Sequence, residues 1–259
     1  MLAEERRNHI LEMLEKQQFI SVIELHDEFR VSRETIRRDI NRLAEESRLI
    51  KTHGGAQSIA HKEPAFAKRM SANLEAKRAI GERAADLAPD NSTVIIDSGT
   101  TCLCIAEALM VRRNLTIITN DINVAGKLAD RNGNRVLILG GELIDGESAT
   151  MGRDSTSMLA NYFADVAFIG ISAMSDDGIL SDYTREAAAL RETMISQART
   201  PVLVGDHDKF GWIASTRIEG IERIRYLVTD RKLQPRLDRK LKSARVEVIV
   251  ADSVVYVQK

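Results

Sequence analysis

The sequence predicts an α/β protein in which a small N-terminal winged helix-turn-helix precedes a larger domain with a mainly parallel sheet. The N-terminal segment carries three short helical patterns followed by a paired-glycine turn. The rest of the chain alternates short apolar runs with helical patterns, and such alternation is typical of a parallel sheet with helices on both faces. The length of 259 residues exceeds the usual size of one domain, so two domains are expected.

The composition is that of a soluble globular protein. Hydrophobic residues make up 44% and charged residues 29% of the chain, and no window approaches the roughly 18 apolar residues of a membrane span. The start, MLAEERRNHILEMLEK, carries both signs of charge and lacks the apolar core of a secretory signal, so we expect a cytoplasmic protein. Cys102 and Cys104 are expected to be buried thiols in a reducing compartment. The net charge of −1 gives no overall attraction to nucleic acid, so a DNA-binding surface requires local clustering.

The first two helices are predicted by apolar spacing and by a capping signal. A helix is expected over residues 4–16, where apolar residues recur at helical spacing at Ile10, Leu11 and Leu14. A short extended piece, FIS, follows it. Ser21 and Glu24 then form the sequence signature of a capping box, which predicts a second helix over VIELHDEF.

The third helix and a wing follow after only a few residues. Ser32 is expected to cap this helix, whose buried stripe is Ile36, Ile40 and Leu43. RLIKTHGGAQ is expected to form two short strands joined by a turn at Gly54 and Gly55, where glycine tolerates a positive φ. Three helices closed by a wing describe a winged helix-turn-helix, whose third helix normally enters the DNA major groove.

The stretch VSRETIRRDI gives the third helix a basic exposed face. Arg33 and Arg37 are four residues apart and therefore share one side of the helix. The planar guanidinium group can pair bidentately with O6 and N7 of guanine. Ser32, Thr35 and Arg38 are placed to hold phosphates near the helix N-terminus. The alternative is an ordinary solvated helix with salt bridges such as Glu34 to Arg38.

Seven apolar runs predict the strands of the larger domain: TVIID, LTIIT, RVLILG, VAFIGI, PVLVGD, YLVTD and VEVIVA. We expect a DNA-binding domain over residues 1–57, a linker over residues 58–73 around Pro64, and the α/β domain over residues 74–259. Sheets of this kind bind ligands at the carboxyl ends of their strands.

The first of these runs ends in a candidate anion site, DSGTT. Asp97 ends the strand, and small or hydroxyl residues lead into a helix, so backbone amides and hydroxyls can hold a phosphate. This site comprises Asp97, Ser98, Gly99, Thr100 and Thr101. Each of these residues can instead serve as an ordinary helix cap.

Polar residues at other strand ends and at one helix start are expected to converge on the same crevice: Thr119 and Asn120, Gly141 and Glu142, Glu186, and Lys209. The side chains can bond to hydroxyls, and Lys209 can meet a phosphate as a point charge. The ligand implied is a phosphorylated polyol. His207 stands between two aspartates, but no second histidine has ligand spacing, so neither a metal nor a cofactor is expected.

The segment ELHDEFRVSRETIRRDINRLAEESRLIKTHGGA closely resembles the N-terminal signature of the DeoR family of bacterial transcriptional regulators, including its VS..TIRRD core and terminal HGGA. The resemblance continues through DSGTT, TN, GGE, EA and D..KF, and so covers nearly the whole chain. It implies that Thr35, Arg37 and Arg38 belong to the recognition helix and that His53 and Gly54 belong to the wing.

The resemblance also implies a C-terminal sensor domain that is similar to sugar-phosphate isomerases and binds phosphorylated sugars or their derivatives. The sequence departs from the family pattern at Leu190, where many relatives place a lysine four residues after the counterpart of Glu186. This departure bears on the charge of the effector.

Two functions from different classes fit these observations. The first is a DNA-binding regulator, with family habit favouring a repressor of a carbohydrate or polyol operon, whose operator affinity changes when a phosphorylated sugar binds. Its partners would be operator DNA, that effector, and further copies of the chain as a dimer or tetramer, because helix-turn-helix operators usually have two half-sites. The second is a phosphosugar isomerase with an accessory DNA-binding domain. The regulator is favoured because no paired catalytic carboxylates are evident in the sequence.

Overall fold

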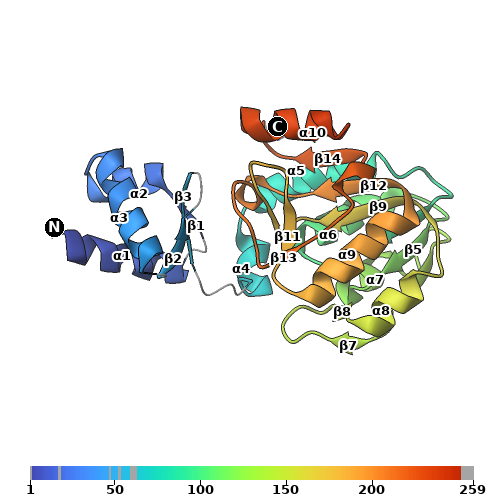
Figure 1. The fold of residues 1–259 in the computed structure, drawn as a ribbon. Coiled ribbons are helices and arrows are strands. Elements are labelled where there is room, and N and C mark those ends of the chain that lie inside the picture. Colours follow the sequence, from blue (N-terminus) through green and yellow to red (C-terminus); the bar gives the residue numbers. More distant parts are fainter. Residues whose placement is uncertain (1, 17–18, 47, 52–53, 59–62, 252–259) are drawn as a thin grey trace, which may run out of the picture. The chain divides into compact units, whose positions relative to one another are not determined.

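The computed structural model describes residues 2–16, 19–46, 48–51, 54–58 and 63–251. The chain divides into two compact units, an N-terminal unit, Met1–Glu63, and a C-terminal unit, Pro64–Lys259 (Figure 1). Among the residues given a structure, no helix is long and apolar enough to cross a membrane.

Helices and a small sheet form the N-terminal unit, in the order α1 (Ala3–Lys16), β1 (Phe19–Ser21), α2 (Val22–Phe29), α3 (Arg33–Glu45), β2 (Leu49–Lys51) and β3 (Gly55–Ser58). The capping box of α2 is present, with Ser21 Oγ accepting from Glu24 N at 3.1 Å and Glu24 Oε2 accepting from Ser21 N at 2.7 Å. The predicted stripe of α3 is buried in one core with residues of α1, α2 and the strands, which confirms the predicted helices.

The wing differs from the expectation in two respects. Its sheet has three strands rather than two, in the order β1-β3-β2, with both pairs antiparallel. Neither Gly54 nor Gly55 has a positive φ. Gly55 is instead required by the close approach of β1, because a Cβ at this position would lie 2.0 Å from the carbonyl oxygen of Ile20.

A buried ion pair joins α1 to α3. Nε of Arg6 lies 2.5 Å from Oδ2 of Asp39, and both residues are buried. Within the RRDI motif, Asp39 therefore stabilises the fold by holding α1 against α3. Removal of one partner would leave a buried charge without compensation, which typically costs about 3–5 kcal/mol.

The seven predicted strands form one sheet in the C-terminal unit, in the order β15-β14-β12-β9-β4-β5-β6, and every adjacent pair is parallel. Their bounds are β4 (Thr93–Ile96), β5 (Thr116–Thr119), β6 (Arg135–Ile138), β9 (Ala164–Gly170), β12 (Ala198–Val204), β14 (Tyr226–Thr229) and β15 (Glu247–Val250). Strand β9 lies beside β4 in the sheet, although β5 and β6 come between them in the chain. The predicted α/β fold class is confirmed.

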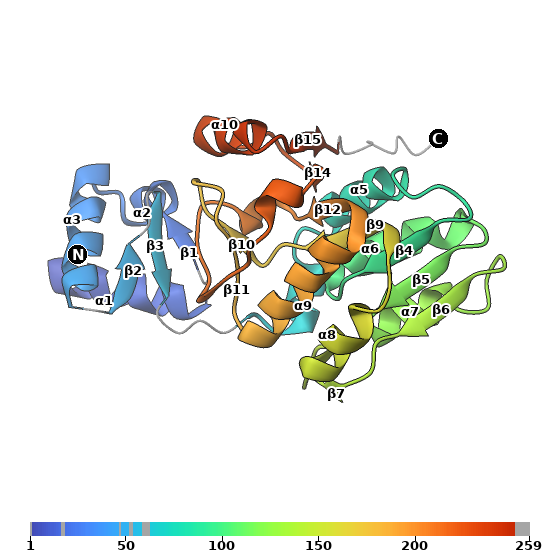
Figure 2. The same ribbon diagram turned by 45° about the vertical axis from the view of Figure 1, so that its right-hand side comes forward.

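Helices cover both faces of this sheet (Figure 2). The α-helices are α4 (Phe66–Ser71), α5 (Leu74–Ala85), α6 (Thr100–Ala108), α7 (Ile122–Leu128), α8 (Arg153–Leu159), α9 (Arg185–Gln197) and α10 (Pro235–Ser243). Val94 and Ile96 of β4 point into a core with α5, α6 and α7, whereas Ile95 points into the opposite core with α8, α9 and α10. Helix α4 lies within the segment that we expected to be a linker.

Short elements complete the C-terminal unit. Two hairpins lie outside the main sheet: β7 (Glu142–Leu143) pairs with β8 (Thr150–Met151), and β10 (Ala173–Met174) pairs with β11 (Leu180–Asp182), which also pairs with β13 (Thr216–Arg217). Three 3₁₀ turns, η1 (Leu109–Val111), η2 (His207–Lys209) and η3 (Ile221–Arg223), connect larger elements. Both hairpins follow the carboxyl ends of sheet strands, so they contribute to the edge where a ligand would bind.

Candidate DNA-binding and effector-binding sites

Helix α3 presents the predicted basic face to solvent. Arg33, Arg37 and Arg38 are exposed, while Ile36 and Ile40 on the same helix are buried. The three guanidinium groups can therefore reach a DNA groove without disturbing the core. Neither Arg33 nor Arg38 forms an ion pair with another residue in the described part of the chain.

Exposed ion pairs are present on α3, as the salt-bridge alternative expects, but they are weak. Glu34 pairs with Arg37 rather than with Arg38, at 3.9 Å, and both side chains are more than 60% exposed. Exposed pairs of this kind contribute roughly 0–1 kcal/mol and are readily exchanged. Arg37 is thus available to a phosphate or a base edge.

The hydroxyls at the start of α3 take part in its N-cap. Ser32 Oγ accepts from the backbone N–H of Thr35 at 3.1 Å, and the two side-chain oxygens lie 2.9 Å apart. This cap fixes the helix N-terminus that we expect to face the phosphates. In the wing, Gly54 is exposed, whereas His53 lies outside the described residues.

At the carboxyl end of β4, Asp97 holds the loop of residues 97–101 in place. Its Oδ1 accepts from Ser98 N at 2.7 Å, and its Oδ2 accepts from Gly170 N at 3.1 Å. Gly99, with φ of 110°, then turns the chain into α6 and provides no side-chain cap. The N–H groups in the first turn of α6 therefore face the loop without an intrahelical partner.

Three hydroxyls surround this helix start. The residues Ser98, Thr100 and Thr101 are each more than nine-tenths buried. Their side-chain oxygens form no hydrogen bond with other residues of the described ranges. These three oxygens are not among the fully buried polar atoms without a partner, so solvent reaches them and they can meet a ligand with several oxygen atoms. The residues predicted to form an anion site thus lie together at the start of α6.

The end of β5 is attached to the same loop through a residue that the sequence analysis did not select. Asp121 caps α7 by accepting from Asn123 N at 2.7 Å, and its second oxygen accepts from Gly99 N at 3.3 Å. Burial raises the pKa of Asp121, and these backbone hydrogen bonds oppose the rise. The predicted Thr119 and Asn120 are fully buried directly before it.

The side-chain amide of Asn120 has one polar atom with a hydrogen-bond partner and one without. Its Nδ2 donates to the carbonyl oxygen of Thr150 at 3.0 Å. Its Oδ1 is buried and has no hydrogen-bond partner in the described part of the molecule. A buried acceptor without a partner costs free energy unless a ligand or water satisfies it.

The remaining predicted residues occupy less central positions. Gly141 packs against Ser155 and Thr150. Glu142 on β7 and Glu186 in the first turn of α9 are both exposed. Within the described ranges, no hydrogen bond or ion pair joins either glutamate to the 97–101 loop.

Three cations gather near this edge, and only Lys209 was expected. Burial lowers the pKa of the Lys77 ammonium, and the positive charges of Lys209 and Arg69 lower it further, against an opposing effect of Asp206. Lys77 is almost fully buried, with Nζ 2.6 Å from the carbonyl oxygen of Ala72 and 3.7 Å from Oδ2 of Asp206. Lys77 and Arg69 face the acidic partners Asp206 and Glu147, so this edge carries both signs of charge.

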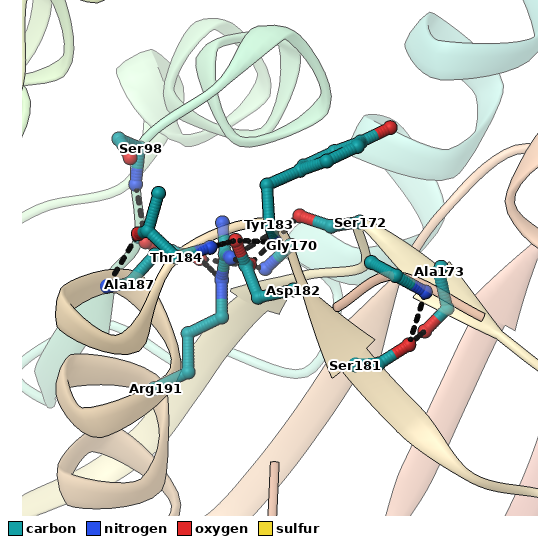
Figure 3. A network of polar contacts seen from close by, with 12 residues as sticks. Ser98, Gly170, Ser172, Ala173, Ser181, Asp182, Tyr183, Thr184, Ala187 and Arg191 are labelled. Atoms are coloured by element: carbon teal, nitrogen blue, oxygen red, sulfur yellow. Dashed lines mark hydrogen bonds and ion pairs between the residues drawn. The ribbon is translucent and has the colours of Figure 1, made fainter. Parts of the chain in front are cut away.

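A second unexpected group, Arg191, also binds Asp97, and Figure 3 shows Arg191 in a polar network with Ser172 and Asp182. Arg191 of α9 donates from Nε to Asp97 Oδ2 at 2.7 Å, and its Nη1 pairs with Asp182 and lies 3.2 Å from Ser172 Oγ. Ser172 Oγ in turn donates to Asp182 Oδ2 at 2.8 Å. Asp97 is thus fully engaged within the protein, and its geometry suits positioning of the loop better than direct ligand contact.

The fold and these two surfaces define a DNA-binding regulator with an α/β sensor domain. The model of the DeoR-like helix-turn-helix domain matches residues 6–62, and the model of the DeoR C terminal sensor domain matches residues 72–231. The chain belongs to the DeoR family of transcriptional regulators.

Curated relatives agree with this assignment. The chain is 34% identical to the glycerol-3-phosphate regulon repressor of Escherichia coli (strain K12), over 87% of this chain and 90% of the relative. It is 33% identical to the HTH-type transcriptional repressor GlcR of Bacillus subtilis (strain 168), over 89% of this chain and 90% of that protein. Because such relatives are named repressors, the chain is a regulator rather than an enzyme.

Solved structures that match the chain include the sorbitol operon regulator SorC from Klebsiella pneumoniae. That match has a TM-score of 0.42 and 12% identity and covers 91% of this chain and 97% of that one. A ribose 5-phosphate isomerase from Plasmodium falciparum matches with a TM-score of 0.38 and 15% identity over 52% of each chain.

Proposed function

We propose that this protein represses a carbohydrate or polyol operon and that a phosphorylated sugar or polyol controls its affinity for operator DNA. The observation that carries the proposal is the start of α6, where three hydroxyls that have no protein partner among the described residues lie beside the unpaired backbone N–H groups of the helix. Relatives named as repressors of a glycerol-3-phosphate regulon support this class of effector.

In this proposal the phosphate binds at Ser98, Gly99, Thr100 and Thr101. The sugar hydroxyls extend toward Thr119 and Asn120, where the unpaired Oδ1 of Asn120 accepts a hydrogen bond. Lys209 adds positive charge, while Gly141, Glu142 and Glu186 form the outer part of the site. Asp97 contributes by holding the loop through its bonds to Ser98, Gly170 and Arg191.

On the DNA side, we propose that Arg33 and Arg37 contact bases and that Ser32, Thr35 and Arg38 contact phosphates. His53 and Gly54 complete the interface from the wing. Residues 1–57 serve as the DNA-binding domain and residues 74–259 as the sensor, with residues 58–73 between them. The protein acts as a dimer or tetramer in the cytoplasm, because a two-fold symmetric protein matches an operator with two half-sites.

A thermal-shift screen of sugar and polyol phosphates against the full-length protein tests the effector. A ligand that binds only the folded state stabilises it by about 2.7 kcal/mol at one hundred times its Kd. Phosphorylated compounds should raise the Tm, and their unphosphorylated counterparts should not. Thr101→Val should abolish the shift and the effector response while sparing operator binding.

Thr93→Val is the matched control, because Thr93 begins β4 at the end opposite the 97–101 loop. This variant should respond as the wild type does. An equal response of Thr101→Val and Thr93→Val would place the effector elsewhere, and no shift with any phosphorylated compound would remove the proposed ligand class.

A further inference from the structure

Arg69 brings a guanidinium group to the 97–101 loop from a distant part of the sequence. A Cβ placed on Gly99 would lie 3.9 Å from Nη1 of Arg69. The side chain is only 10% exposed, and its guanidinium carbon lies 5.6 Å from the ring centre of Phe66. Arg69 is therefore held close to the start of α6, where the effector's phosphate is proposed to bind.

The guanidinium group already has an anionic partner at this place. Nη2 of Arg69 pairs with the carboxylate of Glu147, which lies in the turn between β7 and β8. This turn is fastened to the end of β5, because Ile122 N donates to the carbonyl oxygen of Ser148 at 2.9 Å. Asp121, the residue before Ile122, accepts from Gly99 N. Glu147 thus places a negative charge beside the loop that would receive the phosphate.

We propose that Arg69 is an effector ligand and that it exchanges Glu147 for the phosphate when the effector binds. A guanidinium group can hold two phosphate oxygens in a bidentate arrangement, and phosphate carries more charge than a carboxylate. The incoming anion also repels Glu147, so attraction of Arg69 and repulsion of Glu147 favour the same exchange. This inference rests on the proposed phosphate site at residues 98–101.

The exchange would act on the point where the chain enters the C-terminal unit. Arg69 Nε donates to the carbonyl oxygen of Pro64 at 2.8 Å, and Pro64 is the first residue of that unit. The backbone of α4 is attached in turn to α5, because Lys77 Nζ donates to the carbonyl oxygens of Arg69 and Ala72. A new partner for Arg69 therefore alters the contacts of the segment that leads directly from the DNA-binding unit.

Phosphate titrations of four full-length proteins test this inference: the wild type, Glu147→Gln, Arg69→Lys and Thr101→Val. The probe is inorganic phosphate, the readout is Tm, and chloride at matched ionic strength is the control. Glu147→Gln removes the competing charge and should lower the half-saturating phosphate concentration by about three- to tenfold. Arg69→Lys keeps the charge but loses the bidentate fork, so it should raise that concentration by a similar factor.

Hydrogen exchange of residues 64–72 provides a readout that does not depend on affinity. Saturating phosphate should change exchange in this segment of the wild type and should change it less in Arg69→Lys. An unchanged half-saturating concentration in Glu147→Gln, with Thr101→Val still deficient, overturns the exchange of partners and leaves the proposed effector site standing. No phosphate-specific Tm shift in the wild type overturns both.

Discussion

At the scale of single residues, Arg37 tests the DNA-binding surface most directly. Its side chain is exposed and only loosely paired with Glu34. Arg37→Ala should therefore weaken operator binding by about 1–3 kcal/mol while leaving the Tm unchanged. Arg42→Ala is the control, because Arg42 lies in the last turn of α3 and pairs with Glu46 at 2.8 Å. Electrophoretic mobility shifts of both variants measure the difference, and equal affinities would remove Arg37 from the contact set.

The buried thiol of Cys104 should make the free energy of unfolding depend on pH in the alkaline range. Burial raises the pKa of its thiol from 9.0 to about 11. Between these values the unfolded chain has lost the proton that the folded chain retains, so the free energy of unfolding falls as pH rises from about 9 to about 11. Below about pH 9 the contribution of Cys104 to the free energy of unfolding is fully present. Cys104→Ala should reduce this loss by about 2 kcal/mol, as measured by urea unfolding at pH 8 and pH 10.5. An identical loss in both proteins would exclude Cys104 as its source.

Three of the residues that the sequence analysis missed share one property. Arg191 follows the buried stripe of α9, four residues after Ala187 and three before Met194. Lys77 occupies the corresponding place on α5, before Ile80 and Ala84, and Asp39 lies in the stripe of α3. A charge at a core position of a helix is a signal for a buried ion pair. Its partner is not readable from the sequence, because Asp97 lies 94 residues from Arg191.

At the scale of elements, Gly81 sets how closely α5 can pack on α6. A Cβ at Gly81 would lie 2.8 Å from the backbone carbon and oxygen of Cys104, which cannot move without shifting α6. Gly81→Ala should destabilise the protein by about 1–3 kcal/mol despite the better helix propensity of alanine. Because α6 begins at the proposed phosphate site, this variant should also weaken effector binding.

Gly126 in α7 is the matched control for this substitution. It is also a helical glycine, but a Cβ at Gly126 would have no neighbour within 4 Å. Gly126→Ala should therefore stabilise the protein by up to about 1 kcal/mol. Chemical denaturation of both variants checks the pair, and changes of the same sign would show that packing against α6 does not govern Gly81.

Hydrophobic pattern was sufficient to predict the seven strands of the main sheet, but not every element or contact. The seven strands were predicted because each is an apolar run, and such runs are typical of strands buried on both faces. FIS was expected to be extended, but its pairing with the wing was missed, because so short a run does not indicate partners that lie 34 to 38 residues away. Helix α4 has no buried residue and therefore no apolar stripe to reveal it.

At the scale of the whole molecule, the two units have separate cores, and the proposed route of communication between them is the chain near Pro64. The sequence predicted both surfaces, because each depends on local motifs: the basic third helix and the DSGTT helix start. It did not reveal how they are connected. The proposed connection depends on Arg69, Lys77 and Glu147, which come from three separate segments.

Thermodynamic linkage relates effector binding to operator binding in the intact protein. If the effector changes operator affinity by some factor, operator DNA must change effector affinity by the same factor, because both describe one coupling free energy. Typical couplings of about 1–3 kcal/mol correspond to roughly 5- to 150-fold. Calorimetric titration of the effector, with and without saturating operator, should therefore give two dissociation constants whose ratio equals the effector-induced change in operator affinity.

The control for this measurement is a DNA fragment of equal length without the operator. It contacts the same arginines through phosphates but lacks the base contacts, so it should change effector affinity less at moderate salt. Arg69→Lys should bring the two ratios toward one together, since it acts on the contacts at Pro64 through which the units are proposed to communicate. Ratios that differ for the wild type would mean that effector and operator bind different assemblies of the protein, because reciprocity holds for any single assembly at equilibrium.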